Sequence, residues 1–300
     1  MTFTLTDAEY ELLPTPDEVR SYQQHGWYIS RPLFSTEQLE RVVAASERYY
    51  AGERDLPMPA GAPDWGWTPA KGDCLRKNDW ASLQNRELWQ LVRSPVLAAI
   101  AATLAGTDEI RLWHDQLLYK PVDRPERSNN VGWHTDRGYW KTCSSSAMLT
   151  AWIPFHDCDE SMGTVSMIDG SHRWPDNTER GLDFFNPDLT SLEAKFDSGG
   201  RPVVKVPMVL KAGQVSFHSC LTIHGSGPNR SDRPRRSIAV HLQDEANRWR
   251  KHVFPSGQIA KHGNDTMTRV VDGHPDYRDP IVCPTLWRGR VPTPVAAGTA

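Results

Sequence analysis

The stretch "KAGQVSFHSCLTIHGSGPNRSDRPRRSIAVHLQ", Lys211 to Gln243, decides the fold class. It holds two runs of β-branched and aromatic residues, 213–225 and a second that begins at Arg235. Polar and apolar positions alternate in both, which is the period of a strand with one buried face. A segment rich in glycine, proline and serine separates the two runs, as expected for a turn. We therefore expect two β-strands here, joined by a tight connection.

Similar runs begin at about Glu109 and continue through the middle of the chain. They are "EIRLWHDQLLYKP" (109–121), "SAMLTAWIPF" (146–155), "TVSMI" (164–168) and "RPVVKVPMVL" (201–210). Together with the two runs above they make six candidate strands, whose number and spacing favour an antiparallel sandwich or jelly roll. The insert near 171–200 lacks strong alternation and is expected to cover one end of the sandwich.

The first 108 residues indicate helices instead. Thr15 and Ser35 begin capping boxes, and "SPVLAAIAATLAG" (94–106) predicts a third helix. Residues near 54–80 are rich in proline, glycine and tryptophan and are interpreted as an ordered, lid-like loop. We expect a mainly β fold with flanking helices in one domain, 1–300: a helical part (1–108), a jelly-roll core (109–244) and a C-terminal extension with a loose tail (245–300).

Composition excludes several functional classes. The 34 basic and 37 acidic residues give a net charge of -3, without the positive patch typical of proteins that bind nucleic acid or anionic membranes. No targeting signal or membrane-spanning segment is evident, so a cytoplasmic protein is expected. The five cysteines never form a CxxC pair, which argues against disulfides and thiolate zinc sites. Oligomeric state leaves no signal in the sequence.

The sequence "WHTD", Trp133 to Asp136, raises the question of a metal site. In an extended strand His134 and Asp136 point to the same side, which permits chelation, although a hydrogen-bonded surface pair also fits this common triplet. His224, where a strand gives way to a turn, is the best third ligand. Two histidines and one carboxylate suit non-haem Fe(II) and leave open positions for a cosubstrate and O2, but zinc uses the same ligands.

Arg235 indicates what else such a site holds. Alternation places it on one strand face with Ser237, Ala239 and His241, and a buried guanidinium requires an anionic partner. The dicarboxylate 2-oxoglutarate can chelate iron at one end and pair with Arg235 at the other. The alternative is that the arginines between Arg230 and Arg236 form a solvated edge.

These segments, with "LTAWIPFHDCDESMGTVSMIDGSH" (149–172), resemble the phytanoyl-CoA dioxygenase family of Fe(II)- and 2-oxoglutarate-dependent oxygenases, over roughly Gln116 to Gln243. The resemblance implies a double-stranded β-helix core. It implies Fe(II) bound by His134, Asp136 and His224, and 2-oxoglutarate bound by Arg235. Further positions in the cosubstrate pocket would be Trp152, Ser226, Gln116 and, by approximate spacing, Lys77, for which Lys120 is a competitor.

The function expected from this resemblance is oxidation, most simply hydroxylation, of a C–H bond in a small molecule, with O2 consumed and succinate and CO2 released. Specialised metabolism is a reasonable setting, and Asp136 argues against halogenation, because halogenating relatives replace this carboxylate. A zinc-dependent hydrolase or lyase, a non-catalytic 2-oxoglutarate-binding protein and a plain jelly-roll binding module remain as alternatives. The motif's aromatic neighbours Trp133, Tyr139 and Trp140 are candidates for a substrate wall, and His114, His156, His218 and His241 are read as core or rim histidines.

Overall fold

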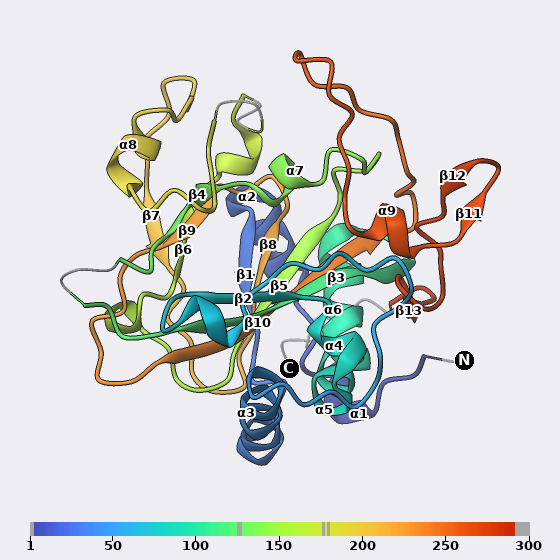
Figure 1. Cartoon of the computed structure of the whole chain (residues 1–300), viewed down its shortest axis with the longest axis horizontal. Coiled ribbons are helices and arrows are strands. Elements are labelled where there is room, and N and C mark those ends of the chain that lie inside the picture. The colour runs from blue at the N-terminus through green and yellow to red at the C-terminus, as the bar shows by residue number, and fades with distance from the viewer. Residues whose placement is uncertain (1–2, 125–127, 176–177, 179–180, 292–300) are drawn as a thin grey trace, which may run out of the picture.

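The computed structural model describes residues 3–124, 128–175, 178 and 181–291, and its core consists of two antiparallel sheets (Figure 1). The larger sheet has seven strands. Its order is β1 (Trp27–Ile29), β8 (Ser216–Ser219), β5 (Leu149–Pro154), β10 (Arg235–Asp244), β3 (Glu109–Lys120) and β13 (Thr285–Arg288), with β2 (Arg76–Asp79) paired to β3. The long strands β10 and β3 run side by side at its centre, with Arg235 opposite Lys120.

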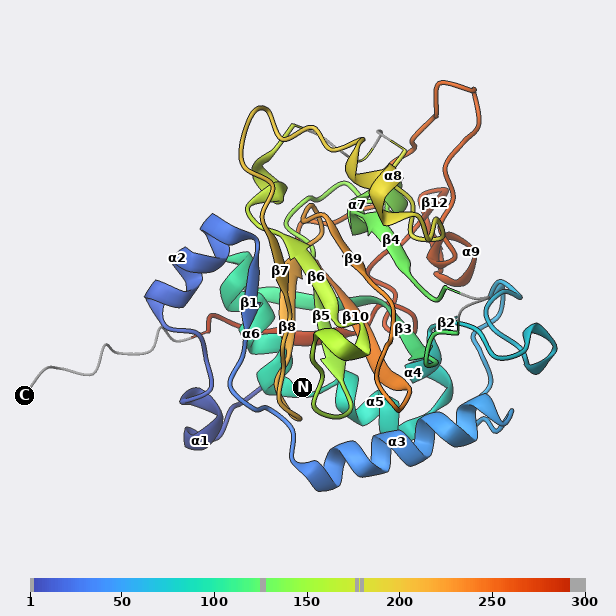
Figure 2. The same cartoon turned by 90° about the vertical axis from the view of Figure 1, so that its left-hand side faces the viewer.

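The smaller sheet has the order β4 (Val131–His134), β9 (His224–Ser226), β6 (Val165–Ile168) and β7 (Lys205–Pro207), and Figure 2 shows it from its own side of the molecule. An apolar cluster joins the sheets, because Trp152 and Ala239 of the larger sheet pack with Val165 and Met167 of the smaller one. The expected jelly-roll sandwich is therefore confirmed. A separate hairpin is formed by β11 (Val270–Val271) and β12 (His274–Pro275).

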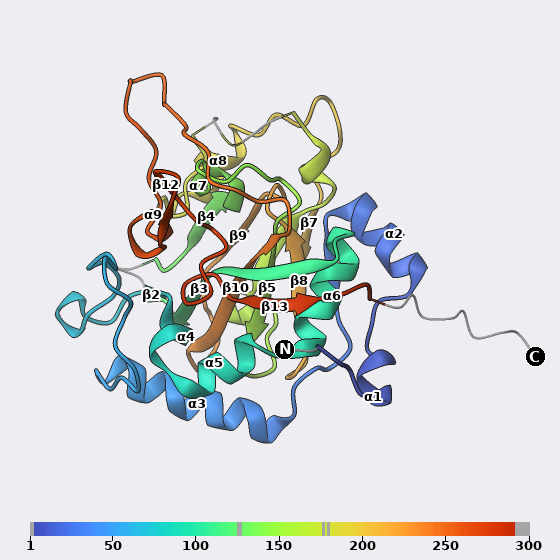
Figure 3. The same cartoon turned by 90° about the vertical axis from the view of Figure 1, so that its right-hand side faces the viewer.

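Helices cover the outer face of the larger sheet (Figure 3). They are α1 (Asp7–Tyr10), α2 (Pro16–His25), α3 (Thr36–Tyr50), α4 (Ala81–Gln84), α5 (Arg86–Val92) and α6 (Pro95–Ala105). The capping boxes at Thr15 and Ser35 are present, and Gly26 ends α2 with a φ of 81°. The helix starts predicted at Thr15 and Ser35 are therefore present, and the strands β1 and β2 also lie in this part of the chain.

Short helical elements lie at the other end of the core and in the loops. They are α7 (Asp136–Tyr139), α8 (Leu189–Glu193), α9 (Asn264–Met267) and the 3₁₀ turns Pro69–Lys71, Glu160–Met162 and Ser171–Arg173. Among its described residues, the insert near 171–200 thus contains the 3₁₀ turn Ser171–Arg173 and α8. The predicted loose tail lies largely outside the described residues.

Three details of the predicted elements were wrong, two in the strands and one in the lid-like loop. The run 213–225 is not one strand, because Cys220–Ile223 turn the chain from β8 in the larger sheet to β9 in the smaller. The run 201–210 forms only β7. The lid-like loop near 54–80 ends earlier than expected, since Arg76–Asp79 form β2, whose four residues are too few for alternation to reveal.

One segment, Arg86–Ala105, is long and apolar enough by composition to cross a membrane, contrary to the expectation that no segment approaches that length. Its most apolar window is 61% buried, and the helix is interrupted at Arg93–Ser94 between α5 and α6. Eight α6 residues are buried against the sheet and neighbouring helices. Packing in the protein core therefore explains why this segment is so apolar.

Candidate metal and cosubstrate site

His134, Asp136 and His224 come together between the ends of the smaller sheet's strands. The pairing of β4 with β9 sets His134 opposite His224, and one ligand atom from each of the three side chains lies within 4.8 Å of the others. All three are buried. The strand ends at His134 and Asp136 is the first residue of α7, so the two side chains converge across a strand end and not along one extended strand.

The hydrogen bonds of the two imidazoles direct their Nε2 atoms toward Asp136. His134 Nδ1 lies 2.8 Å from the Gly132 carbonyl oxygen and His224 Nδ1 lies 3.0 Å from that of Thr222, so each Nδ1 carries the proton. The Nε2 atoms then have free lone pairs, 3.9 and 3.7 Å from Asp136 Oδ1. This is the tautomer that a metal ligand requires.

Electrostatics favours the same protonation states. Burial lowers the pKa of both His134 and His224, which keeps the imidazoles neutral. Burial by itself raises the pKa of Asp136, but the surrounding histidines outweigh it and hold that pKa well below its usual range. Two neutral imidazoles and one carboxylate therefore fit a divalent cation without losing protons.

The second oxygen of Asp136 contacts Thr150, which the sequence did not single out, and His218, which was read as a core or rim histidine. Thr150 Oγ1 donates to Asp136 Oδ2 at 2.6 Å and contacts His241 Nδ1 at 2.7 Å, while His218 Nε2 lies 3.3 Å from the same oxygen. Thr150 lies two residues before Trp152 on β5, and His218 lies opposite Thr150 on β8. Alternation along β5 from Trp152 is the sequence signal that could have placed Thr150 on the same inner face.

Arg235 lines a narrow cavity together with the three candidate ligands. It is 1% exposed, donates to Ser226 Oγ at 3.0 Å, and holds its guanidinium carbon 5.3 Å from the centre of the Trp152 ring. Its hydrogen bonds to described residues end on a hydroxyl and the Gly163 carbonyl. One narrow cavity is lined by Arg235, Trp152, Ser226 and the three candidate ligands. A buried cation without a carboxylate partner there suits an anionic ligand.

The two candidate lysines lie in different places. Lys120 is fully buried opposite Arg235, with its Nζ 2.5 Å from Ser226 Oγ, and burial followed by the charge of Arg235 lowers its pKa well below the ordinary value. Lys77 instead pairs with Asp79 at 2.7 Å and lines a second, larger cavity. Gln116 lines both cavities and lies 3.4 Å from His114 Nε2.

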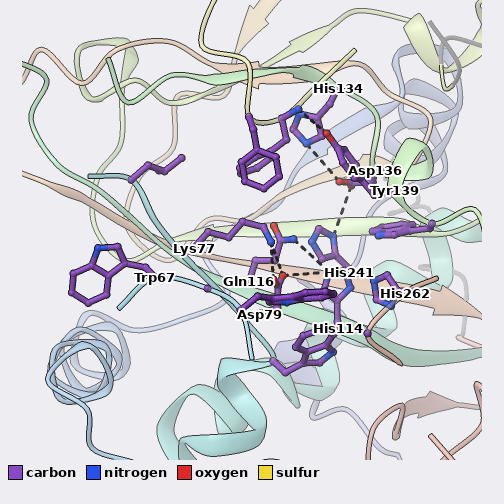
Figure 4. Close-up of a pocket in the computed structure, with 18 of the residues that line it drawn as sticks. Trp67, Lys77, Asp79, His114, Gln116, His134, Asp136, Tyr139, His241 and His262 are labelled. Carbon is purple, nitrogen blue, oxygen red and sulfur yellow. Dashed lines mark hydrogen bonds and ion pairs between the residues drawn. The ribbon is translucent and has the colours of Figure 1, made fainter. Parts of the chain in front are cut away.

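The larger cavity has a volume of about 530 Å³, and His134 and Asp136 line it as well (Figure 4). The loop before β2, residues 65–75, supplies one wall, and Lys261–Gly263 supply another. Tyr139 and Trp140 line it, as the sequence suggested. Trp133 does not, because it packs in an apolar cluster and donates to Glu193 at 3.0 Å.

Comparison with known proteins identifies the family. The family model described as phytanoyl-CoA dioxygenase (PhyH) matches residues 22–237, a span that contains every candidate ligand. The chain belongs to the phytanoyl-CoA dioxygenase family. The resemblance seen in the sequence is thus confirmed, and the match extends well beyond the stretch that first carried it, into the N-terminal helices.

Curated relatives and solved structures of this family agree. The peroxisomal phytanoyl-CoA dioxygenase of Rattus norvegicus is 22% identical over 75% of this chain and 67% of its own length. The ectoine dioxygenase of Bordetella bronchiseptica is 26% identical over 74% of this chain and 73% of its own length. The crystal structure of SnoK, a non-haem α-ketoglutarate-dependent carbocyclase, has a TM-score of 0.61 at 27% identity, covering 79% of this chain and 87% of its own. The structure of EctD from S. alaskensis with 2-oxoglutarate shares the fold at 21% identity and a TM-score of 0.63. The match covers 83% of this chain and 82% of the EctD chain.

Proposed function

We propose that this protein is an Fe(II)- and 2-oxoglutarate-dependent dioxygenase that hydroxylates a C–H bond of a small molecule and releases succinate and CO2. The observation that carries the proposal is the placement of the His134–Asp136–His224 group and the buried Arg235 around one cavity, in a chain of this family. Relatives named as a dioxygenase and a carbocyclase show that the family supports more than one oxidative outcome. Hydroxylation is the simplest of these.

Each residue has a role in this reaction. His134, Asp136 and His224 would hold Fe(II), which supplies the activation of O2 that couples 2-oxoglutarate decarboxylation to oxidation of the substrate. Arg235 would bind the far carboxylate, with Trp152 and Ser226 shaping the pocket. We assign the accessory lysine role to Lys120 rather than Lys77, because Lys120 shares Ser226 with Arg235. Gln116, between the two cavities, would separate cosubstrate from substrate.

The remaining parts of the chain would serve this one site. We propose a single catalytic domain in which the loop before β2 acts as a lid and the C-terminal extension completes the substrate cavity through Lys261–Gly263. A cytoplasmic location fits a small-molecule substrate. Excluding bulk water from the site is the task of the aromatic residues around its mouth.

The test is visible absorption under anaerobic conditions, with Fe(II) and then 2-oxoglutarate added to metal-free protein. A charge-transfer band that needs both additions is expected. It should vanish in Asp136→Ala and require much higher 2-oxoglutarate in Arg235→Ala. Arg236→Ala is the matched control, because Arg236 is the next residue of β10 and pairs with Glu47 of α3 at 2.9 Å, away from the cavity. Its band should be unchanged.

The other outcomes identify the alternatives. A folded protein that binds zinc and gives no band with Fe(II) would support a zinc hydrolase or lyase. A normal band without succinate release, for any substrate tried, would support a 2-oxoglutarate-binding protein without turnover. Equal loss of the band in the Arg235 and Arg236 variants would remove Arg235 from the cosubstrate role.

A further inference from the structure

We propose that the larger cavity binds an aromatic ring system that carries a hydroxyl group, with the rings against the tryptophans and the hydroxyl donating to His241 Nε2. This inference deepens the proposed function, on which it rests, by naming the substrate class of the same site. Three independent features of the cavity carry it: exposed aromatic residues at its mouth, a strained tryptophan in its wall and an unpartnered nitrogen at its inner end.

The mouth of the cavity exposes large aromatic side chains. Trp65, Tyr139 and Phe185 are 58%, 42% and 69% exposed, although residues of this size are usually covered in a folded chain. All three line the same opening. Exposed aromatic surface concentrated at one hollow marks a binding site for a partner with apolar faces, and ring–ring contacts favour a flat partner.

The wall of the cavity contains a residue in a costly backbone conformation. Trp80 has a φ of 56°, in the left-handed region that a bulky residue rarely adopts. Its backbone N–H donates to the Asp115 carbonyl and its indole Nε1 donates to Asn264 Oδ1, both at 2.8 Å. Strain of this kind persists where the surroundings fix it, commonly at ligand clamps.

The C-terminal extension is shaped to accept the Trp80 ring. A Cβ on Gly263 would lie 2.1 Å from that ring, so only glycine allows this approach. Trp80 also stacks with Trp65, at 5.9 Å between ring centres and 23° between planes. Trp80, which is 2% exposed, is therefore held in place and supports Trp65, whose exposed ring faces the opening of the cavity and offers a surface for a flat ligand.

The inner end of the cavity offers a hydrogen-bond acceptor. The single proton of the Thr150 hydroxyl goes to the Asp136 carboxylate, so Thr150 Oγ1 accepts from His241 Nδ1–H. In the neutral imidazole Nε2 then carries the lone pair. Within the described chain His241 Nε2 has no hydrogen-bond partner, although the residue is buried and lines the cavity. A hydroxyl of the substrate would satisfy it.

The charges of the lining favour a neutral or weakly acidic molecule. Asp79 is paired with Lys77, and Asp136 faces the other candidate ligands. Lys71 and Lys261, at the rim, are exposed. Because no further carboxylate lines this cavity among the described residues, a cationic group would have no partner there. A phenol-like hydroxyl meets these conditions.

The test is equilibrium dialysis of zinc-loaded protein against two tricyclic probes that differ by one hydroxyl, 2-hydroxyfluorene and fluorene. The hydroxylated probe is expected to bind about tenfold more tightly, the effect of one hydrogen bond in a buried site. His241→Phe should abolish that preference and leave fluorene bound. Trp65→Ala should weaken both probes about tenfold. Ile281→Ala, an exposed apolar residue outside the cavity lining, is the control and should change neither.

The outcomes separate this inference from the proposed function. Binding of neither probe, or equal binding of both to the unmodified protein, overturns the inference. If palmitoyl-CoA binds more tightly than either probe, and Trp65→Ala weakens its binding, the inference is overturned in favour of an acyl thioester substrate. The charge-transfer band is measured without any probe, so a normal band with no aromatic binding refutes the substrate class alone. Aromatic binding without a band refutes the oxygenase function instead.

Discussion

Thr150 is expected to control metal affinity although it is not itself a ligand. Thr150→Val keeps the shape of the side chain but removes the 2.6 Å hydrogen bond to Asp136 Oδ2 and the 2.7 Å contact with His241. A hydrogen bond to a charged group contributes about 1.5–3 kcal/mol. With about 1.4 kcal/mol for each factor of ten, this predicts a loss of about 10- to 100-fold in metal affinity, the range typical of residues that orient ligands.

The assay is anaerobic competition for Fe(II) against a chromophoric chelator, with folding checked by thermal unfolding. Thr164→Val is the matched control, because Thr164 is also buried and donates at 2.6 Å, but to the Met208 carbonyl. Its affinity for Fe(II) should equal that of the unmodified protein. If both valine variants bind Fe(II) as tightly as the parent, the orientation of Asp136 does not depend on Thr150 and the reasoning fails.

Three further predictions concern stability. Burial raises the pKa of Asp115 to about 7, so between about pH 4 and pH 7 the native state holds a proton that the unfolded state has lost. The free energy of unfolding should therefore fall as the pH rises through this range. In urea titrations Asp115→Asn should be more stable than the parent by a few kcal/mol at about pH 8 and equal to it at about pH 4. Ser35→Ala removes the cap of α3 and should cost about 1 kcal/mol by the same method; an unchanged midpoint would show that the cap contributes nothing. Gly263→Ala forces a Cβ against Trp80 and should cost about 1–3 kcal/mol and weaken probe binding, whereas full stability would mean that the Trp80 ring is free to move.

Much of the fold was predictable because its signals are local. The capping boxes at Thr15 and Ser35 specify helix starts from four adjacent residues. The long strands β3, β5 and β10 were recognised as runs of β-branched and aromatic residues, although the structure buries both of their faces. The short strands β1, β2 and β13 carry no such signal. They are held by their pairing with β8 and β3, which depends on chain segments far away in sequence.

The candidate site likewise divides into features that the local sequence predicts and features that depend on tertiary contacts. The sequence by itself determined the chemical groups: a histidine and a carboxylate two residues apart, a histidine before a turn, and an arginine on an alternating strand. Only the tertiary structure decided that Lys120 rather than Lys77 lies beside Arg235, that Thr150 and His218 hold Asp136, and that residues 65–80 and 261–263 enclose one cavity. Periodicity reports which face a side chain occupies within its own element. Partners across the fold are set by strand pairing and loop closure between distant segments, such as those of Trp80 and Asn264, which are 184 residues apart.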